Sequence, residues 1–256
     1  MEQHHLRDLI FLLVLGCVLS SCGTISTFQT GKTIPQKKVS FGMGSSVGLT
    51  RTKSNLVGYP IELPYGSIEA FLGYGLFDFL DINVKAMAAQ YARPSEEGSK
   101  KLRGLPFFGG ASARLAMVQE RWGHPVSVAL GYGYYTGAAQ SRQTDLNDVE
   151  TKKESTTLTD KVVTVNCSRD VFKWLTFYGA WKLYERHLVN NTFEYKIQTL
   201  HQEYDDKMDG YGAGVSFNVG REHNTHIMIE TNQITDTDEP TKHYQKQVGL
   251  GMSVDF

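Results

Sequence analysis

The sequence lacks the long apolar segment that a membrane-spanning helix requires. Its longest apolar run, residues 9–19, has eleven residues, whereas about 20 are needed to cross the hydrocarbon core of a bilayer. Cysteine is scarce, and the three residues Cys17, Cys22 and Cys167 cannot form a disulfide framework. Charge of one sign is not in excess, with 26 Lys and Arg against 27 Asp and Glu, so no nucleic-acid partner is expected.

Signatures of several common catalytic sites are also missing. The sequence contains no H-E-x-x-H zinc motif and no C-x-x-C motif, and its glycine pairs do not form a phosphate-binding loop. We therefore expect no catalysis, no metal and no cofactor. Glycine and aromatic residues are plentiful instead, with 25 Gly, 13 Tyr and 13 Phe, and this composition favours sheets and turns over helices.

The N-terminal residues have the pattern of an export signal. Residues 9–19 have the length of the apolar core of a secretory signal peptide. Leu19, Ser20 and Ser21 then precede Cys22, a pattern that resembles the bacterial lipobox. This resemblance implies that residues 1–21 are removed and that Cys22 carries acyl chains such as palmitate. The alternative is an ordinary signal peptide that is cleaved near Ser21.

The residues after Cys22 suggest an address and a tether. Gly23 stands where, in enteric bacteria, an Asp would retain a lipoprotein in the inner membrane, so by analogy the chain travels to the outer membrane. Residues 22–38 are mostly polar and include Gly and Pro. We predict that they form the lipidated N-terminus and a periplasmic tether, and that residues 39–256 form the folded domain.

The clearest structural pattern runs from Ser67 to Ala89. Apolar residues alternate with small or polar ones, reverse over a short turn near residues 77–81 and alternate again, which predicts a β-hairpin. A helix is the alternative, but Gly73 and Gly75 would each cost it about 1 kcal/mol. Eight further segments alternate in the same way, at about residues 39–49, 111–118, 126–134, 163–168, 175–183, 211–219, 226–230 and 247–256.

The ten predicted strands are joined by links that alternate in length. Short links are expected near residues 77–81, 120–124, 169–173 and 220–224, and they carry aromatic residues that suit a girdle at the membrane boundary. Long polar links are expected near 53–64, 93–107, 138–158, 188–209 and 235–245, and residues 138–158 are interpreted as a mobile surface loop.

This pattern resembles outer-membrane β-barrels, and the final strand ending at Phe256 resembles the signal that their assembly machinery recognises. The resemblance implies an all-β, ten-stranded antiparallel transmembrane barrel with up-and-down meander topology. It also implies that both ends of the barrel lie on the periplasmic side, where a lipid on Cys22 would enter the inner leaflet of the outer membrane.

Period-two alternation does not by itself say which face of the sheet is inside. A soluble lipocalin-like barrel would bury the apolar set, whereas a membrane barrel would turn it toward lipid. The polar set is rich in Gly, Ser and Ala, which suits a crowded lumen and favours the membrane barrel. A charge facing lipid is costly, so we expect an ion network in the lumen, formed by Glu69, Lys85, Arg114, Lys182 and Glu230.

The sequence favours a structural or surface-binding role without catalysis, and it names no extracellular ligand. One alternative is a narrow channel for small polar solutes, although ten strands enclose little free space. Another is a hydrolase site at the rim, as in the ten-stranded omptin proteases that act through Asp and His residues. Candidates for such a site are His187, His201, Asp205, Asp206 and Asp209.

Overall fold

The computed structural model describes residues 28–53, 60–91, 100–103, 107–144, 150–194, 197–220, 224–237 and 244–256. Almost all of them lie in strands, and within these ranges no helix is long and apolar enough to cross a membrane. The elements are β1 (Val39–Lys53), β2 (Pro60–Phe77), β3 (Leu80–Tyr91), β4 (Lys100–Arg103), β5 (Phe107–Val118), the 3₁₀ turn η1 (Glu120–Trp122), β6 (Ser127–Thr144), β7 (Glu150–Phe172), β8 (Leu175–Glu194), β9 (Ile197–Val219), β10 (Thr225–Asp236) and β11 (Tyr244–Asp255).

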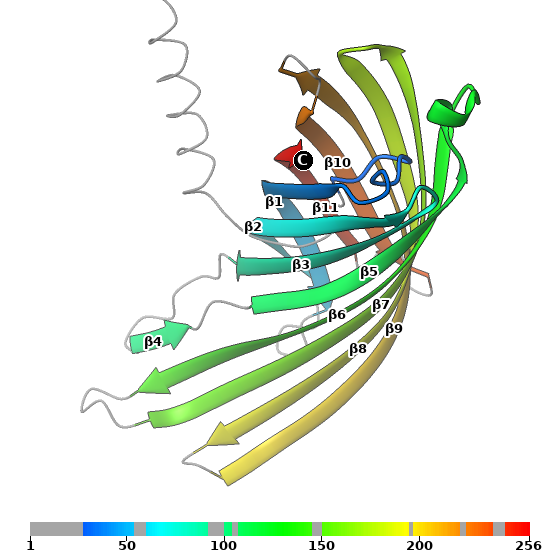
Figure 1. The fold of residues 1–256 in the computed structure, drawn as a ribbon. Helices are drawn as coiled ribbons and strands as arrows, with labels where there is room; N and C mark the ends of the chain where they lie inside the picture. The colour runs from blue at the N-terminus through cyan, green and yellow to red at the C-terminus, as the bar shows by residue number, and fades with distance from the viewer. Residues whose placement is uncertain are drawn as a thin grey trace, which may run out of the picture.

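Ten of these strands close into an antiparallel barrel (Figure 1). Each long strand pairs with the next long strand along the chain, β6 pairs with β7, and β1 pairs with β11 to complete the ring. The short strand β4 pairs only with the end of β6, outside the ring. The expected ten-stranded up-and-down meander is therefore confirmed.

The barrel wall is inside out relative to a soluble protein. Leu72 on β2 and Val84 on β3 are 52% and 57% exposed on the outer face. Lys182 on β8 and Glu230 on β10 face the lumen and are 0% and 1% exposed. A soluble lipocalin-like barrel would show the reverse, so that alternative is wrong. The polar faces of the strands fill the interior, and the apolar faces form a continuous outer belt.

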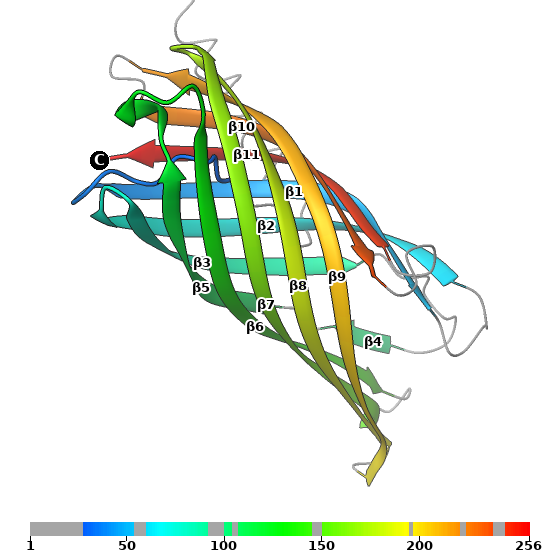
Figure 2. The same ribbon diagram turned by 90° about the vertical axis from the view of Figure 1, so that its right-hand side faces the viewer.

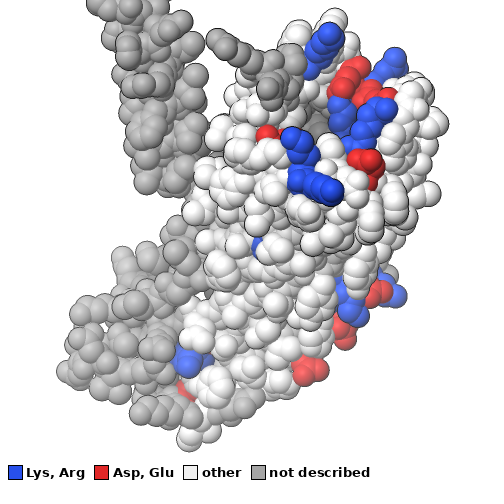
Figure 3. Space-filling view, in the orientation of Figure 1, with Lys and Arg blue, Asp and Glu red and all other residues white. Residues whose placement is uncertain are grey.

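The barrel has two different ends. At the short-turn end, only a few residues separate β2 from β3, β7 from β8 and β9 from β10, as expected from the sequence. Exposed aromatic rings gather there, and Phe77 stacks on Phe79 and Phe172 on Trp174, each pair with ring centroids 5.4 Å apart. Charged side chains on the face shown in Figure 3 gather toward the ends of the barrel and leave a broad uncharged surface between them.

At the opposite, long-hairpin end the wall is uneven in height. Strands β6–β9 have 18 to 23 residues and form a tall wall, whereas β3, β5, β10 and β11 have 12 each. The tall wall projects well beyond the other strands in both ribbon views (Figures 1 and 2). We call the side formed by β10, β11 and β1 the low wall.

The tall wall overturns the prediction of long loops at residues 138–158 and 188–209. The described parts of both regions are paired strand: Ala138 pairs with Thr157, and Leu188 pairs with Tyr204. Sequence alternation fades here because strands outside a bilayer need no apolar face. A usable signal was present, since no Gly or Pro occurs between Gly137 and Gly179, whereas turns and loops are rich in both.

The chain before β1 lies in the barrel mouth and does not hang below it. Residues 28–38, which we call the N-terminal plug, run from the short-turn end into the lumen. Phe28 is 3% exposed and Ile34 is also buried. The predicted boundary at residue 38 stays a prediction, as does the tether before residue 28, because residues 1–27 lie outside the described ranges.

A pair of charge substitutions tests the outer belt. Leu72→Arg should lower the free energy of unfolding in lipid vesicles by about 2–4 kcal/mol, because the guanidinium would face hydrocarbon. Ile197→Arg, at a 69% exposed position at the far end of the tall wall, should change it by less than about 0.5 kcal/mol. Urea titrations of both variants measure the difference, and equal losses would contradict a lipid-facing belt.

Candidate functional site

The interior of the barrel is lined by many buried polar side chains, and all five charged residues predicted to line it face inward. Glu69 on β2 and Lys85 on β3 form an ion pair, with the Glu69 side chain fully buried. The two strands are adjacent in the ring, and the alternation of each strand turns these side chains to the same face. The pair therefore keeps both charges out of contact with the outer belt.

Arg114 on β5 is held by a carboxylate that the sequence analysis missed. Its Nε and Nη2 atoms donate to Oδ1 and Oδ2 of Asp81 at 3.0 and 2.6 Å, the two-pronged geometry that Arg and carboxylates favour. Asp81 was assigned to the turn after β2, although it has the same parity as Asn83 and Lys85 on β3. That parity was the available signal.

Lys182 and Glu230 are linked through the side-chain amide of Asn232. The Lys182 ammonium donates to Asn232 Oδ1 at 2.5 Å, and the Asn232 amide donates to Glu230. The other carboxylate oxygen of Glu230 accepts the backbone N–H of Phe28 at 2.9 Å. The N-terminal plug is thereby connected to the lumen charges.

Phe28 occupies a socket that is lined with glycines. A Cβ atom added at Gly44 would lie 2.3 Å from the Phe28 ring, and one at Gly249 or Gly251 would lie 2.8 Å from it. These glycines come from β1 and β11, and the ring also packs in a buried cluster with Phe71, Tyr178 and Met228. Any larger residue at Gly44 would displace the ring or the strand.

The rest of the plug is held by side chains of the wall. The backbone N–H of Gly31 donates to Ser168 Oγ at 3.1 Å, and its carbonyl accepts from Gln119 Nε2 at 2.9 Å. The N–H of Ile34 donates to Asp81 Oδ2 at 2.8 Å, so Asp81 binds both Arg114 and the plug. A buried backbone segment needs such partners for its N–H and C=O groups.

Charged contacts fasten the plug at the rim. Lys32 Nζ donates to both Asp170 oxygens at 2.5 Å and lies 3.7 Å from Glu120 Oε2. Arg121 donates to the Thr33 carbonyl at 3.1 Å and to Thr33 Oγ1 at 2.9 Å. Partial burial lowers the pKa of the Arg121 guanidinium, against the opposing effect of Asp78 and Asp81, and arginine remains charged in proteins.

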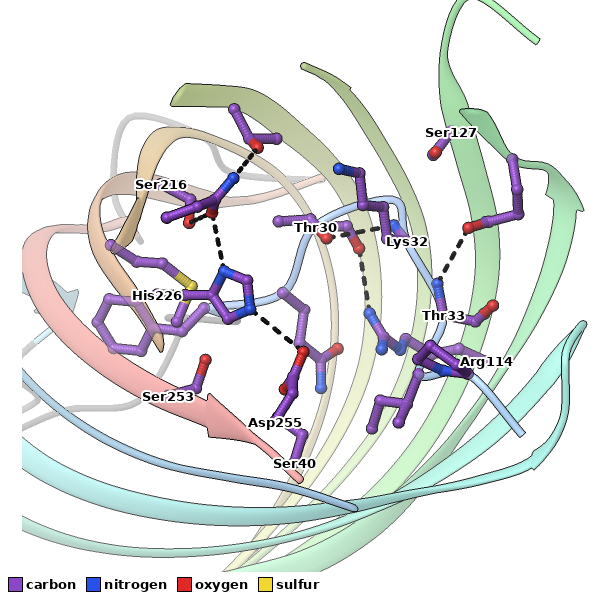
Figure 4. Close-up of a pocket in the computed structure, with 18 of the residues that line it drawn as sticks. Thr30, Lys32, Thr33, Ser40, Arg114, Ser127, Ser216, His226, Ser253 and Asp255 are labelled. Carbon is purple, nitrogen blue, oxygen red and sulfur yellow. Dashed lines mark hydrogen bonds and ion pairs between the residues drawn. The ribbon is translucent and has the colours of Figure 1, made fainter. Parts of the chain in front are cut away.

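A cavity of about 470 Å³ remains between the plug and the wall (Figure 4). His226 stands on its wall between two partners, with Nδ1 2.8 Å from Asn218 Oδ1 and Nε2 3.2 Å from Asp255 Oδ2. The amide of Asn218 donates to the Lys173 carbonyl at 3.3 Å, which turns its oxygen toward the imidazole. Both ring nitrogens of His226 therefore have a polar partner, and Figure 4 shows the imidazole beside Ser216 and Ser253.

The residues of the hydrolase alternative are brought only partly together. His187 Nδ1 lies 2.8 Å from Asp205 Oδ1, and His201 Nε2 lies 3.1 Å from Glu203 Oε1, all on exposed side chains. Strand parity puts these residues on the outer face of the tall wall. Asp206 belongs to the inner face, paired in register with Arg186. Asp209 accepts a hydrogen bond from Thr235 at 3.2 Å.

Two further features of the sequence find plain structural roles. Residues 44–48 have the pattern G-x-S-x-G, but they lie inside β1 and not on a strand-to-helix turn. Ser46 is buried, and its Oγ atom lies 2.8 Å from Ser67 Oγ.

Cys167 is free and exposed on the outer face. Cys22 lies outside the described ranges. Within those ranges, no cluster of three His, Cys, Asp or Glu residues is arranged to hold a metal.

The shared role of Asp81 yields a sharp test. Asp81→Asn should lower the free energy of unfolding by about 3–5 kcal/mol, because the Arg114 charge would remain buried without its counter-ion. Adding Arg114→Met should recover part of that loss. Glu185→Gln, which breaks an exposed contact of 3.9 Å with Lys161, should cost less than about 1 kcal/mol. Denaturant titrations in detergent measure these free energies of unfolding. Equal losses for Asp81→Asn and Glu185→Gln would contradict the assignment.

Comparisons by sequence find no match, either among protein-family models or among curated proteins. Comparisons by structure do. The outer membrane protease OmpT from Escherichia coli is 11% identical with a TM-score of 0.52, and the match covers 90% of this chain and 100% of that one. The translocator domain of the autotransporter NalP from Neisseria meningitidis is 7% identical with a TM-score of 0.52, covering 86% and 89%.

The two similar proteins have different roles, one a protease and the other a translocator domain. At these identities the similarity concerns the fold and not the activity. By its closed ring, its apolar belt and these comparisons, the chain has the fold of bacterial outer-membrane β-barrel proteins.

Proposed function

We propose that the protein is an outer-membrane β-barrel lipoprotein with a structural or surface-binding role, closed to solutes by its own N-terminal plug. The observation that carries the proposal is the insertion of residues 28–35 into the lumen. Their backbone groups are bonded to Asp81, Gln119, Ser168 and Glu230, residues from well-separated strands and turns of the ring. An interior filled in this way supports a rigid wall better than it supports transport.

The tall wall is the part that we propose meets other molecules. In outer-membrane barrels the short turns face the periplasm and the long connections face outward, so β6–β9 would project from the cell. Leu158, Leu188 and Tyr204 are cross-strand neighbours on the inner face of this wall. The apolar side chains Leu200 and Tyr204 remain exposed there. Exposed apolar groups on a rigid sheet suit a partner better than they suit water.

The finer parts of the proposal concern the two chain ends. We propose acylation of Cys22 after removal of residues 1–21, which would add a lipid anchor to the barrel. We also propose that Phe256 is read by the outer-membrane assembly machinery. Its ring is 66% exposed at the short-turn end, and its backbone N–H bonds to the Val39 carbonyl at 2.8 Å. The side chain is thus presented outward where β11 meets β1.

Conductance separates the closed barrel from the channel alternative. The full protein in a planar bilayer should give no single-channel steps. Gly44→Val should produce them, because the added side chain enters the Phe28 socket and expels the plug. Gly109→Val is the matched control and should stay silent, since a Cβ there meets no atom closer than 3.5 Å. Steps from the unaltered protein would favour the channel.

Metabolic labelling with radioactive palmitate tests the lipid anchor. The protein should incorporate label and fractionate with outer membranes, and Cys22→Ala should abolish the incorporation. Cys167→Ala, which changes the other cysteine of the predicted mature chain, should leave it intact. Label retained by Cys22→Ala, or absent from the unaltered protein, would refute acylation at this residue.

A further inference from the structure

We infer that the edge of β9 that projects beyond β10 accepts an extended segment of a partner protein as an additional strand of the tall wall. We call residues 200–206 of β9 the docking edge. The inference rests on the proposed function, in which the tall wall meets other molecules. It adds the chemistry of the partner, which is a chain segment whose basic side chains alternate with apolar ones.

The docking edge exists because β9 is longer than its neighbour in the low wall. β10 ends at Asp236, which pairs with Met208, and the Thr237 N–H then bonds to the Lys207 carbonyl at 3.0 Å. In the part of the chain that the structure describes, residues 200–206 pair with β8 alone. Figure 1 shows β9 as the outermost strand of the projecting wall.

The parity of β9 decides which backbone groups point away from β8. Even-numbered residues bond toward β8, as the Asn218 N–H does to the Trp174 carbonyl at 2.9 Å, and odd-numbered ones bond toward β10, as Lys207 does. The register with β8 is unbroken from residue 217 to residue 200. Glu203 and Asp205 therefore direct their backbone N–H and C=O groups away from β8, because the two sides alternate along an antiparallel strand. Such a row of groups is a template for a further strand.

The opposite border of the tall wall is covered by a strand of this chain. β6 pairs with β5 as far as Ala138, and β4 (Lys100–Arg103) then pairs antiparallel with Ser141–Thr144 of β6. A short and mostly basic strand, with the sequence K-K-L-R, thus extends the sheet on that side. No described strand takes the equivalent place beside the docking edge, which also contains neither Pro nor Lys, residues that often protect exposed edges.

The two faces of the docking edge define the side chains of the partner. Glu203 and Asp205 have exposed side chains on the outer face, whereas Leu200 and Tyr204 are exposed on the inner face. Cross-strand neighbours on the same face of a sheet interact directly. A strand added beside β9 would therefore present basic groups to the acidic outer face and apolar groups to the inner face, which requires a period of two.

A second copy of this chain fits the docking edge less well. Two copies in one membrane stand upright, so their β9 strands would run parallel, whereas β9 pairs antiparallel with both of its neighbours. A two-fold axis along the membrane normal would also bring identical residues to the same height. Glu203 and Asp205 would then meet their own counterparts, and like charges directly opposite each other are destabilising.

Binding of a short peptide to the purified protein tests the inference. The probe is a fluorescent peptide of alternating Lys and Val, and fluorescence anisotropy measures its affinity in detergent. We expect the unaltered protein to bind it, and Glu203→Pro to bind it about tenfold more weakly than Glu203→Gln. Both variants lose the same charge, but only proline loses the N–H that points to the partner, and neither change removes a hydrogen bond to β8.

The charge of the docking edge is tested separately. The double variant Glu203→Lys and Asp205→Lys should reject the Lys–Val peptide and bind a Glu–Val peptide instead. Glu185→Lys, which changes an exposed charge on β8, is the control and should keep the preference for the Lys–Val peptide. N-methylation of alternate amides in the Lys–Val peptide should abolish binding, and it decides the question if Glu203→Pro does not fold.

Four results would overturn the inference. They are no binding by the unaltered protein, equal binding by Glu203→Pro and Glu203→Gln, equal binding of the N-methylated peptide, and a dimer that Glu203→Pro dissociates, which would make a second copy the occupant. Failure of the proposed function gives a different result. A peptide that binds the purified protein but not intact cells would support the docking edge and contradict the outward orientation of the tall wall.

Discussion

The structure depends on one requirement: inside hydrocarbon, every backbone N–H and C=O group must find its partner within the chain. A ring of strands meets the requirement only if the first strand pairs with the last, as β1 does with β11 over twelve residue pairs from Ser40–Asp255 to Arg51–Tyr244. Closure then decides the rest. It gives every strand one face toward lipid and one toward a narrow interior, and it sorts the sequence into two sets of side chains.

Closure of the ring creates an interior in which an unpaired charge would be costly, and the charged side chains there form pairs. Glu69 with Lys85 and Arg114 with Asp81 neutralise one another across neighbouring strands. The N-terminal plug adds to the arrangement, because its backbone N–H groups at Ile34 and Phe28 donate to Asp81 and Glu230. The plug and the lumen charges therefore stabilise each other, since the carboxylates accept hydrogen bonds from N–H groups that the lumen buries.

The sequence predicted those parts of the fold that depend on local alternation. The hairpin between Ser67 and Ala89, the order of the ten strands and the inward faces of Glu69, Lys85 and Lys182 all follow from a period of two. The polar part of the tall wall was missed because a strand outside a bilayer needs no apolar face. There, cross-strand pairing such as Ala138 with Thr157 stabilises a sequence that looks like a loop.

The plug was beyond sequence reasoning for a different reason. Residues 28–38 have no alternation and contain Gly and Pro, which is also true of a tether. What holds them is distant in the chain: Gln119 is 86 residues from Thr33, Ser168 is 137 from Gly31, and Glu230 is 202 from Phe28. No spacing in a single sequence marks contacts of that range, and only the closed ring brings them together.

The position of the Phe28 socket has a consequence for biogenesis. Gly44 belongs to the first strand, and Gly249 and Gly251 belong to the last. The aromatic ring therefore lies over the seam where the first strand of the barrel pairs with the last. An empty socket would leave a void beside this seam, and a misplaced ring would clash with the strands that form it. Insertion of the plug and pairing of the first strand with the last therefore stabilise each other as the barrel is assembled.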